Sequence, residues 1–164
     1  MVPRTDRNGL EILDRQACLD LLATVAIGRL AYLTGGVPRV VPLNVALDGD
    51  RVVFRLSTGN ALAAIESRQF VTLEVDDFDL DACCGWSVAV TGVAAEVPAA
   101  LAAEPGADCR SWLRGRVGRV FHLSTDEVEG RRLLADTVRS SPPQPCSGSM
   151  SSSSASPSGP STTS

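Results

Sequence analysis

The chain has no lysine, a single histidine, and no apolar run long enough to cross a bilayer. All fifteen of its cations are arginines; against nineteen acidic residues they leave a net charge of −4. A net negative charge does not favour binding to nucleic acid. The N-terminus also lacks the apolar segment of a secretory signal, so we expect a cytoplasmic protein without membrane or nucleic-acid partners.

Metal-binding and disulfide patterns are missing too. The five cysteines are an odd set without a CxxC pair, which favours reduced thiols over a zinc site or a disulfide framework. Asp77, Asp79 and Asp81 resemble the start of a calcium loop. However, Ala82 and Val88 stand where that loop requires Gly and Glu. We interpret the run as an acidic connection between strands and predict no metal site.

The familiar catalytic motifs are also absent. No GxSxG elbow, Walker loop or dinucleotide fingerprint occurs, which excludes the commonest hydrolase, nucleotidase and Rossmann types. His122, which any serine or cysteine mechanism with a histidine would need, lies in an apolar run that favours a packed strand position. Chemistry, if any, would therefore have to come from a bound cofactor.

The 164 residues, 44% of them hydrophobic, are sufficient for one globular domain, which we place at residues 8–138. From Ser140 the composition changes to Ser, Pro, Gly and Thr without a charged residue. Such a segment cannot bury enough apolar surface to offset its ordering entropy. Residues 139–164 are therefore predicted to be a disordered Ser/Pro-rich tail.

Hydrophobic periodicity predicts mainly strands within this domain. Asp14 can cap a first helix that ends before Gly28, and a short helix is expected over residues 61–67. Further helical turns are expected at 99–103 and 109–114. The predicted strands cover residues 29–34, 37–47, 51–57, 70–75, 86–97 and 119–128.

The short turns between these strands set the fold class. Gly35-Gly36 and Asp48-Gly49-Asp50 are tight turns, which imply antiparallel neighbours. The strand at 86–97 is long enough to bend at Gly92 and serve two sides of a closed sheet. We therefore predict a mainly β fold with short α-helices, built as a six-stranded antiparallel β-barrel.

The segment 52–62 predicts an anion site. Strand alternation places Arg55 and Ser57 on one face of the third strand. The turn Thr58-Gly59-Asn60 then opens a short helix whose free N–H groups would face the same place, so a phosphate would fit there. In the alternative interpretation, Arg55 is a solvated strand residue and Asn60 an ordinary N-cap. The segment alone leaves both open.

Two further positions suit contact with a planar ring. Pro42 removes a ladder donor and so implies an edge or a bulge, which leaves Asn44 beside an irregular backbone. Asn44 can then contact a heterocycle, or it can be satisfied by nearby backbone. Trp86 begins a strand together with Ser87, and its indole can stack on a ring or cap the barrel.

Together these segments resemble the pyridoxamine 5′-phosphate oxidase-like family of flavin-binding split barrels, especially its short actinobacterial members. The resemblance covers roughly residues 10 to 133 and lies in the order and spacing of several segments rather than in one decisive motif. Its segments are Ala26-Ile27-Gly28-Arg29-Leu30-Ala31, Val41-Pro42-Leu43-Asn44, Asp48-Gly49-Asp50, Val53-Phe54-Arg55, Glu74-Val75-Asp76-Asp77 and Gly85-Trp86-Ser87-Val88 leading to Gly92.

The resemblance implies a six-stranded FMN-binding split barrel that forms a homodimer, with two FMN molecules in grooves between the subunits. It assigns the flavin phosphate to Arg55, Ser57 and Thr58, in agreement with the anion site inferred from the segment itself. It also places Asn44 where the family approaches the flavin ring.

Trp86 and Ser87 correspond to a strand that reaches the flavin from the neighbouring subunit. No catalytic side chain and no metal ligand is assigned. The predicted cofactor-binding residues are Pro42, Asn44, Arg55, Ser57, Thr58, Asn60, Trp86 and Ser87.

The sequence departs from the family pattern in two places. Family members often carry a lysine after the turn, where this chain has Ala61. Loss of an ammonium near a phosphate removes about 1 to 3 kcal/mol of binding free energy. The C-terminal arginine-rich motif that holds substrate in true pyridoxamine-phosphate oxidases is also absent, since Arg131 and Arg132 do not reproduce it. Vitamin-salvage activity is therefore not supported.

The leading hypothesis is a flavin-dependent oxidoreductase that binds FMN and acts on an unidentified small molecule. A deazaflavin-dependent reductase is one alternative. Another is a non-enzymatic flavin- or haem-binding module of the same fold, which the replacement of lysine by Ala61 favours. An unrelated, monomeric small barrel that carries a hydrophobic ligand is a third and weaker alternative.

Overall fold

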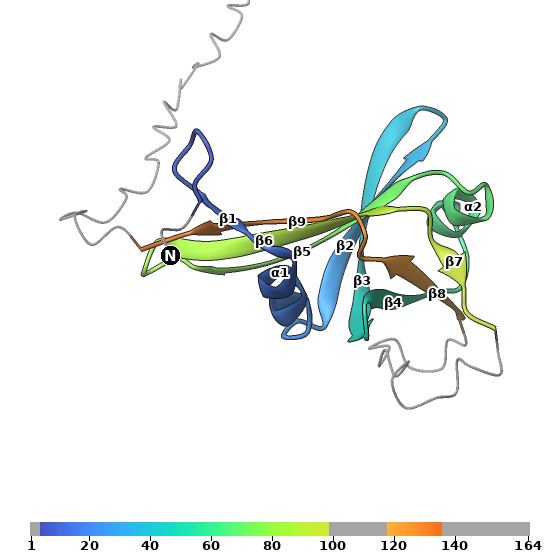
Figure 1. The fold of residues 1–164 in the computed structure, drawn as a ribbon. Helices are drawn as coiled ribbons and strands as arrows, with labels where there is room; N and C mark the ends of the chain where they lie inside the picture. The colour runs from blue at the N-terminus through green and yellow to red at the C-terminus, as the bar shows by residue number, and fades with distance from the viewer. Residues whose placement is uncertain (1–3, 99–117, 136–164) are drawn as a thin grey trace, which may run out of the picture.

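The computed structural model describes residues 4–98 and 118–135, which form nine strands and two short helices (Figure 1). The predicted helical turns at 99–103 and 109–114 and the predicted tail at 139–164 lie outside these residues. No helix within the described part is long and apolar enough to span a membrane.

The two helices lie close to where the sequence places them. α1 (Arg15–Leu22) begins after Asp14, whose side chain accepts a hydrogen bond from the N–H of Ala17 at 2.8 Å. This confirms the predicted cap. α2 (Asn60–Glu66) begins one residue earlier than predicted and is preceded by Gly59.

The strands form one antiparallel sheet in the order β1-β9-β6-β5-β2-β3-β4-β8-β7. Their bounds are β1 Glu11–Leu13, β2 Ile27–Thr34, β3 Val37–Asp48, β4 Arg51–Leu56, β5 Val71–Asp79, β6 Cys84–Gly92, β7 Ala95–Glu96, β8 Arg119–Ser124 and β9 Val128–Leu133. The mainly β class and the antiparallel order are confirmed. The predicted number of six strands is wrong, because the described residues contain nine.

The additional strands arise from two sharp corners and one short segment. The predicted strand 86–97 is divided after Gly92, so that β6 pairs with β5 and β9 while β7 pairs with β8. The predicted strand 119–128 is likewise divided at residues 125–127 into β8 and β9. β1 has only three residues, too few for a periodic pattern to show.

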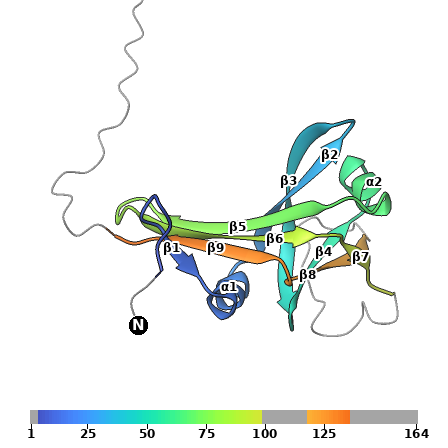
Figure 2. The same ribbon diagram turned by 45° about the horizontal axis from the view of Figure 1, so that its top comes forward.

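The sheet curls because β3 is shared between two halves. Residues 37–44 of β3 pair with β2, whereas residues 45–48 pair with β4. Figure 2 shows β5, β6 and β9 aligned along one axis, as antiparallel neighbours, and β3 and β4 crossing them steeply, with α1 against one face. β6 and β8 are also in contact although they are not paired. The result is a half-barrel around an apolar core.

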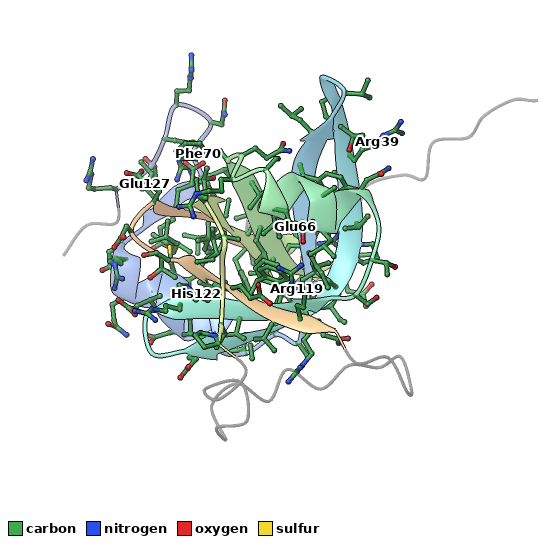
Figure 3. All side chains as sticks on the ribbon, turned by 90° about the vertical axis from the view of Figure 1, so that its right-hand side faces the viewer. Arg39, Glu66, Phe70, Arg119, His122 and Glu127 are labelled. Carbon is green, nitrogen blue, oxygen red and sulfur yellow. The ribbon has the colours of Figure 1, made fainter. Side chains whose placement is uncertain are left out.

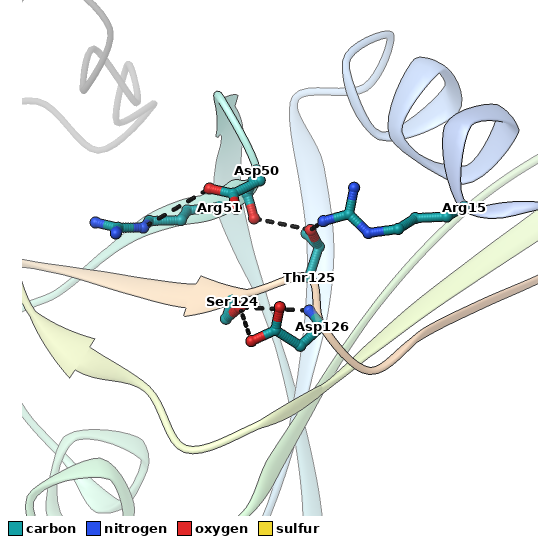
Figure 4. A network of polar contacts seen from close by, with 6 residues as sticks. All are labelled: Arg15, Asp50, Arg51, Ser124, Thr125 and Asp126. Atoms are coloured by element: carbon teal, nitrogen blue, oxygen red, sulfur yellow. Dashed lines mark hydrogen bonds and ion pairs between the residues drawn. The ribbon is translucent and has the colours of Figure 1, made fainter.

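The corner between β8 and β9 is fixed by a fully buried threonine (Figure 4). The hydroxyl of Thr125 donates to the carbonyl oxygen of Asp50 at 2.8 Å, and its backbone N–H donates to the same oxygen. Arg15 of α1 in turn donates to the hydroxyl at 2.8 Å. These bonds satisfy the polar atoms of a buried corner and tie α1, the β3–β4 turn and the two halves of the sheet together.

An ion-pair cluster attaches α2 to the other end of the sheet. Arg119 of β8 donates to both carboxylate oxygens of Glu96, at 2.7 and 2.6 Å, and also to Glu66 of α2 (Figure 3). Its guanidinium lies 5.3 Å from the ring centroid of Phe121. The cluster connects α2, β7 and β8 at the surface.

Candidate functional site

The candidate site is a groove that opens where β4 separates from β3. The ladder between them ends at the pair Val45 and Phe54. Upstream of Val45, β3 pairs with β2 on one side, and residues 55–61 diverge from its other side toward α2. A polar turn at residues 57–59, outside any strand, allows this divergence.

The groove has a volume of about 680 Å³, within the usual size range of small-molecule sites. Most of its wall is apolar, and Arg55 is the one charged residue among the described residues that line it. The lining residues are Ile27, Tyr32, Val41, Pro42, Leu43, Asn44, Arg55, Leu56, Ser57, Thr58, Gly59, Asn60 and Ala61.

Six of the eight predicted cofactor-binding residues therefore lie together along this groove. Arg55 is partly buried, and within the described part of the chain its side chain forms no hydrogen bond or ion pair. Several other arginines are paired. Arg29, for example, pairs with Glu74 and Asp76, and Arg132 pairs with Glu11. Among the described residues, no carboxylate neutralises the cation that Arg55 places in the groove.

The alternative interpretations of the polar residues can now be compared with the geometry. Gly59 occupies the N-cap position at φ 99°, without a side-chain cap, and Asn60 is the first helical residue. The alternative in which Asn60 caps the helix is therefore wrong. The Asn44 amide does contact nearby backbone, donating to the carbonyl of Ala26 at 3.4 Å, and it still lines the groove.

The comparisons with known proteins agree with this architecture. The family model described as pyridoxamine 5′-phosphate oxidase matches residues 14–140. The chain belongs to the pyridoxamine 5′-phosphate oxidase family. This confirms the resemblance inferred from the sequence, and the half-barrel is that family's split-barrel fold.

Among relatives, the uncharacterized protein Rv0080 of Mycobacterium tuberculosis is 32% identical over 146 residues, covering 82% of this chain and 92% of that protein. A solved FAD binding protein from Mycobacterium smegmatis is 28% identical with a TM-score of 0.57, over 76% of this chain and 98% of that one. A conserved protein of unknown function from Corynebacterium diphtheriae shares 29% identity with a TM-score of 0.62, over the same fractions.

In this family member, Trp86 and Ser87 lie away from the groove of their own chain. Trp86 lines a separate hollow of about 570 Å³ at the β5–β6 hairpin and packs partly against the core. Ser87 points to the opposite face of β6, because successive strand residues alternate. One chain therefore does not bring these two residues to the other six.

His122 also lies outside the groove. It pairs with Val53 and Ala95 in the sheet and is partly buried, as its apolar run predicted. Burial, and then the charge of Arg51, lower the pKa of His122. Asp79 of the acidic run accepts the N–H groups of two following residues at 3.0 and 2.8 Å, which closes the β5–β6 turn.

Sequence reasoning missed several lining residues, of which Tyr32 has the clearest chemical consequence. Tyr32 is 8% exposed and belongs to the inward face of β2, so its pattern predicts only a core residue. Ala61, which the sequence resemblance had singled out, is 6% exposed and lines the groove without supplying a charge. No local signal identifies Tyr32 as a groove residue, since this depends on the separation of β4 from β3.

Proposed function

We propose that this protein binds a flavin nucleotide in the groove, with the phosphate held by Arg55, Ser57 and Thr58. The observation that carries the proposal is the convergence of two hydroxyl residues and one guanidinium, which has no side-chain partner among the described residues, on a mostly apolar groove. Apolar walls suit a planar ring system. A phosphate instead needs fixed donors, and charge-assisted donors are the strongest.

FMN is the flavin that the sequence resemblance favours, whereas the similar protein from M. smegmatis is described as FAD binding. Both molecules carry the isoalloxazine ring and a phosphate on the ribityl chain, so the same groove chemistry serves either. We propose FMN as the first ligand to test, with FAD and a deazaflavin as competing ligands.

The proposed activity is oxidoreduction of a small molecule. A bound flavin would supply the hydride or electron transfer. Among the described lining residues there is no histidine, cysteine or carboxylate, so this chain's own contribution is binding, orientation and exclusion of water. The deeply buried Ala61 favours a second candidate, a non-enzymatic flavin- or haem-binding module, because the groove has only one cation to hold a phosphate.

We also propose that two chains form a homodimer that completes the site. The exposed side chains of Leu33 (49%), Val40 (61%) and Phe70 (70%) share the face of the sheet that points away from the core. The β2–β3 ladder places Leu33 and Val40 close together, and Phe70 directly precedes β5, which pairs with β2. Ser87 lies on this same face through its pairing with Asp76, so a second copy could bring its Ser87 to this groove.

Titration of the ligand-free protein with FMN, FAD and a deazaflavin, followed by flavin fluorescence, tests the proposal. We expect saturable uptake of a flavin at one per chain. Protein that is colourless as purified and takes up none of the three would contradict it. Turnover of reduced flavin with small-molecule acceptors then separates the enzyme from the binding module. The mass in solution tests the dimer.

A further inference from the structure

Tyr32 lies at the end of the groove where α2 begins. On β2, Ile27 pairs with Asn44 and Tyr32 pairs with Arg39. Tyr32 therefore lies about 16 Å along the strand from the position opposite Asn44. The residues that follow Tyr32, Leu33 and Thr34, line a small hollow together with Asn60 and residues 63–64 of α2. Tyr32 is thus close to the first turn of α2.

The Tyr32 hydroxyl is available to a ligand. The side chain is 8% exposed and forms no hydrogen bond within the described part of the chain. The Tyr32 hydroxyl is not among the buried side-chain atoms without a partner there, which are Thr34 Oγ1 and His122 Nδ1. Tyr32 lines the groove, so a ligand in the groove would meet its side chain.

Among the described residues that line the groove, a phosphate would meet one cation. Arg55 is the sole charged residue of that set, and Ala61 contributes no side-chain donor. A phosphate has several acceptor oxygens, and a phenol is a good neutral donor to them. A tyrosine hydroxyl beside the first turn of α2 therefore compensates in part for the missing second cation.

We propose that Tyr32 is a further ligand-binding residue whose hydroxyl donates a hydrogen bond to the phosphate of the bound nucleotide. This inference rests on the proposed flavin site and adds a contact that selects phosphorylated ligands over their dephosphorylated forms. Its aromatic ring forms part of the core, so Tyr32→Phe removes the hydroxyl and keeps the packing.

The test compares the affinities of FMN and riboflavin, which differ only in the phosphate, for three proteins. These are the full-length wild type, Tyr32→Phe and Thr34→Val. The last removes a neighbouring hydroxyl that does not line the groove. We expect Tyr32→Phe to lose about tenfold or more in FMN affinity and nothing in riboflavin affinity. Thr34→Val should change neither.

Equal losses for FMN and riboflavin would overturn the inference, because they would place the hydroxyl at the ring or the ribityl chain. Unchanged FMN affinity in Tyr32→Phe, with a wild type that binds FMN, would overturn this inference alone. A wild type that binds no flavin would overturn it together with the proposed function. Circular dichroism of each variant shows whether its fold is retained.

Discussion

Replacement of Arg55 by alanine should separate ligand binding from folding in this protein. Arg55 lines the groove and, within the described residues, has no hydrogen bond or ion pair that its removal would break. Substitutions that break no buried contact usually change stability by about 0.5 kcal/mol or less. Arg55→Ala should therefore lower the affinity for flavin and leave the free energy of unfolding almost unchanged.

The expected loss in binding is about 2 kcal/mol, the value typical of a hydrogen bond to a charged group. This corresponds to roughly thirtyfold in the dissociation constant. The loss should be concentrated on phosphorylated flavins, because riboflavin has no group for the guanidinium to hold. Raising the ionic strength should reduce the difference in FMN affinity between the wild type and Arg55→Ala, since salt screens an ion pair that is partly accessible to solvent.

Quenching of FMN fluorescence at fixed ionic strength measures the affinity, and urea unfolding of the ligand-free protein measures stability. Arg7→Ala is the matched control. Arg7 is an exposed arginine in the turn before β1, it does not line the groove, and its loss changes the net charge equally. We expect the control to keep the wild-type affinity.

Two results would refute this reasoning. If Arg55→Ala binds FMN as tightly as the wild type, the phosphate lies elsewhere. If Arg7→Ala weakens binding as much as Arg55→Ala does, the effect reflects net charge and not a contact.

Three further predictions concern the fold. Because burial and Arg51 lower the folded-state pKa of His122, its contribution to stability is complete above the unfolded value of about 6.5 and is lost as the pH falls through the folded pKa. The urea midpoint of the wild type should therefore fall more between pH 7 and pH 5 than that of His122→Gln. Gly130→Ala should destabilise by about 1 to 3 kcal/mol in urea unfolding, because its Cβ would lie 2.7 Å from the Cys18 sulfur. Arg119→Ala should lower the thermal midpoint slightly, and less in high salt, because its partners are exposed glutamates.

Local signals predicted the parts of the fold that depend on local chemistry. Asp14 predicted the start of α1, and Gly35-Gly36 predicted the β2–β3 hairpin, because capping and tight turns have strong residue preferences. The corners were missed for a physical reason. The β8–β9 corner carries the polar run Ser124-Thr125-Asp126-Glu127, but its place in the fold depends on the buried Thr125 and its bonds to Asp50 and Arg15, which lie far away in the sequence.

The candidate site likewise has one part that local sequence predicted and another that depends on the fold. Arg55, Ser57 and Thr58 follow one another closely in the chain, so their proximity could be predicted from one segment. Tyr32 comes to the groove from a different element and has the burial of an ordinary core residue. Only the paths of β3 and β4 in space reveal that its position faces an opening.

The site therefore follows from a single feature of the sheet, the double pairing of β3. If β4 continued to pair with β3 beyond Val45 and Phe54, residues 55–58 would form a closed ladder and no groove would exist. Gly59 adopts a left-handed φ of 99° that glycine tolerates best, and it diverts the chain into α2. Pro42, on the exposed stretch of β3, lacks an N–H that would otherwise need a partner at a free edge. The backbone conformations of these two residues thus favour the open groove in which the Arg55 side chain has no partner among the described residues.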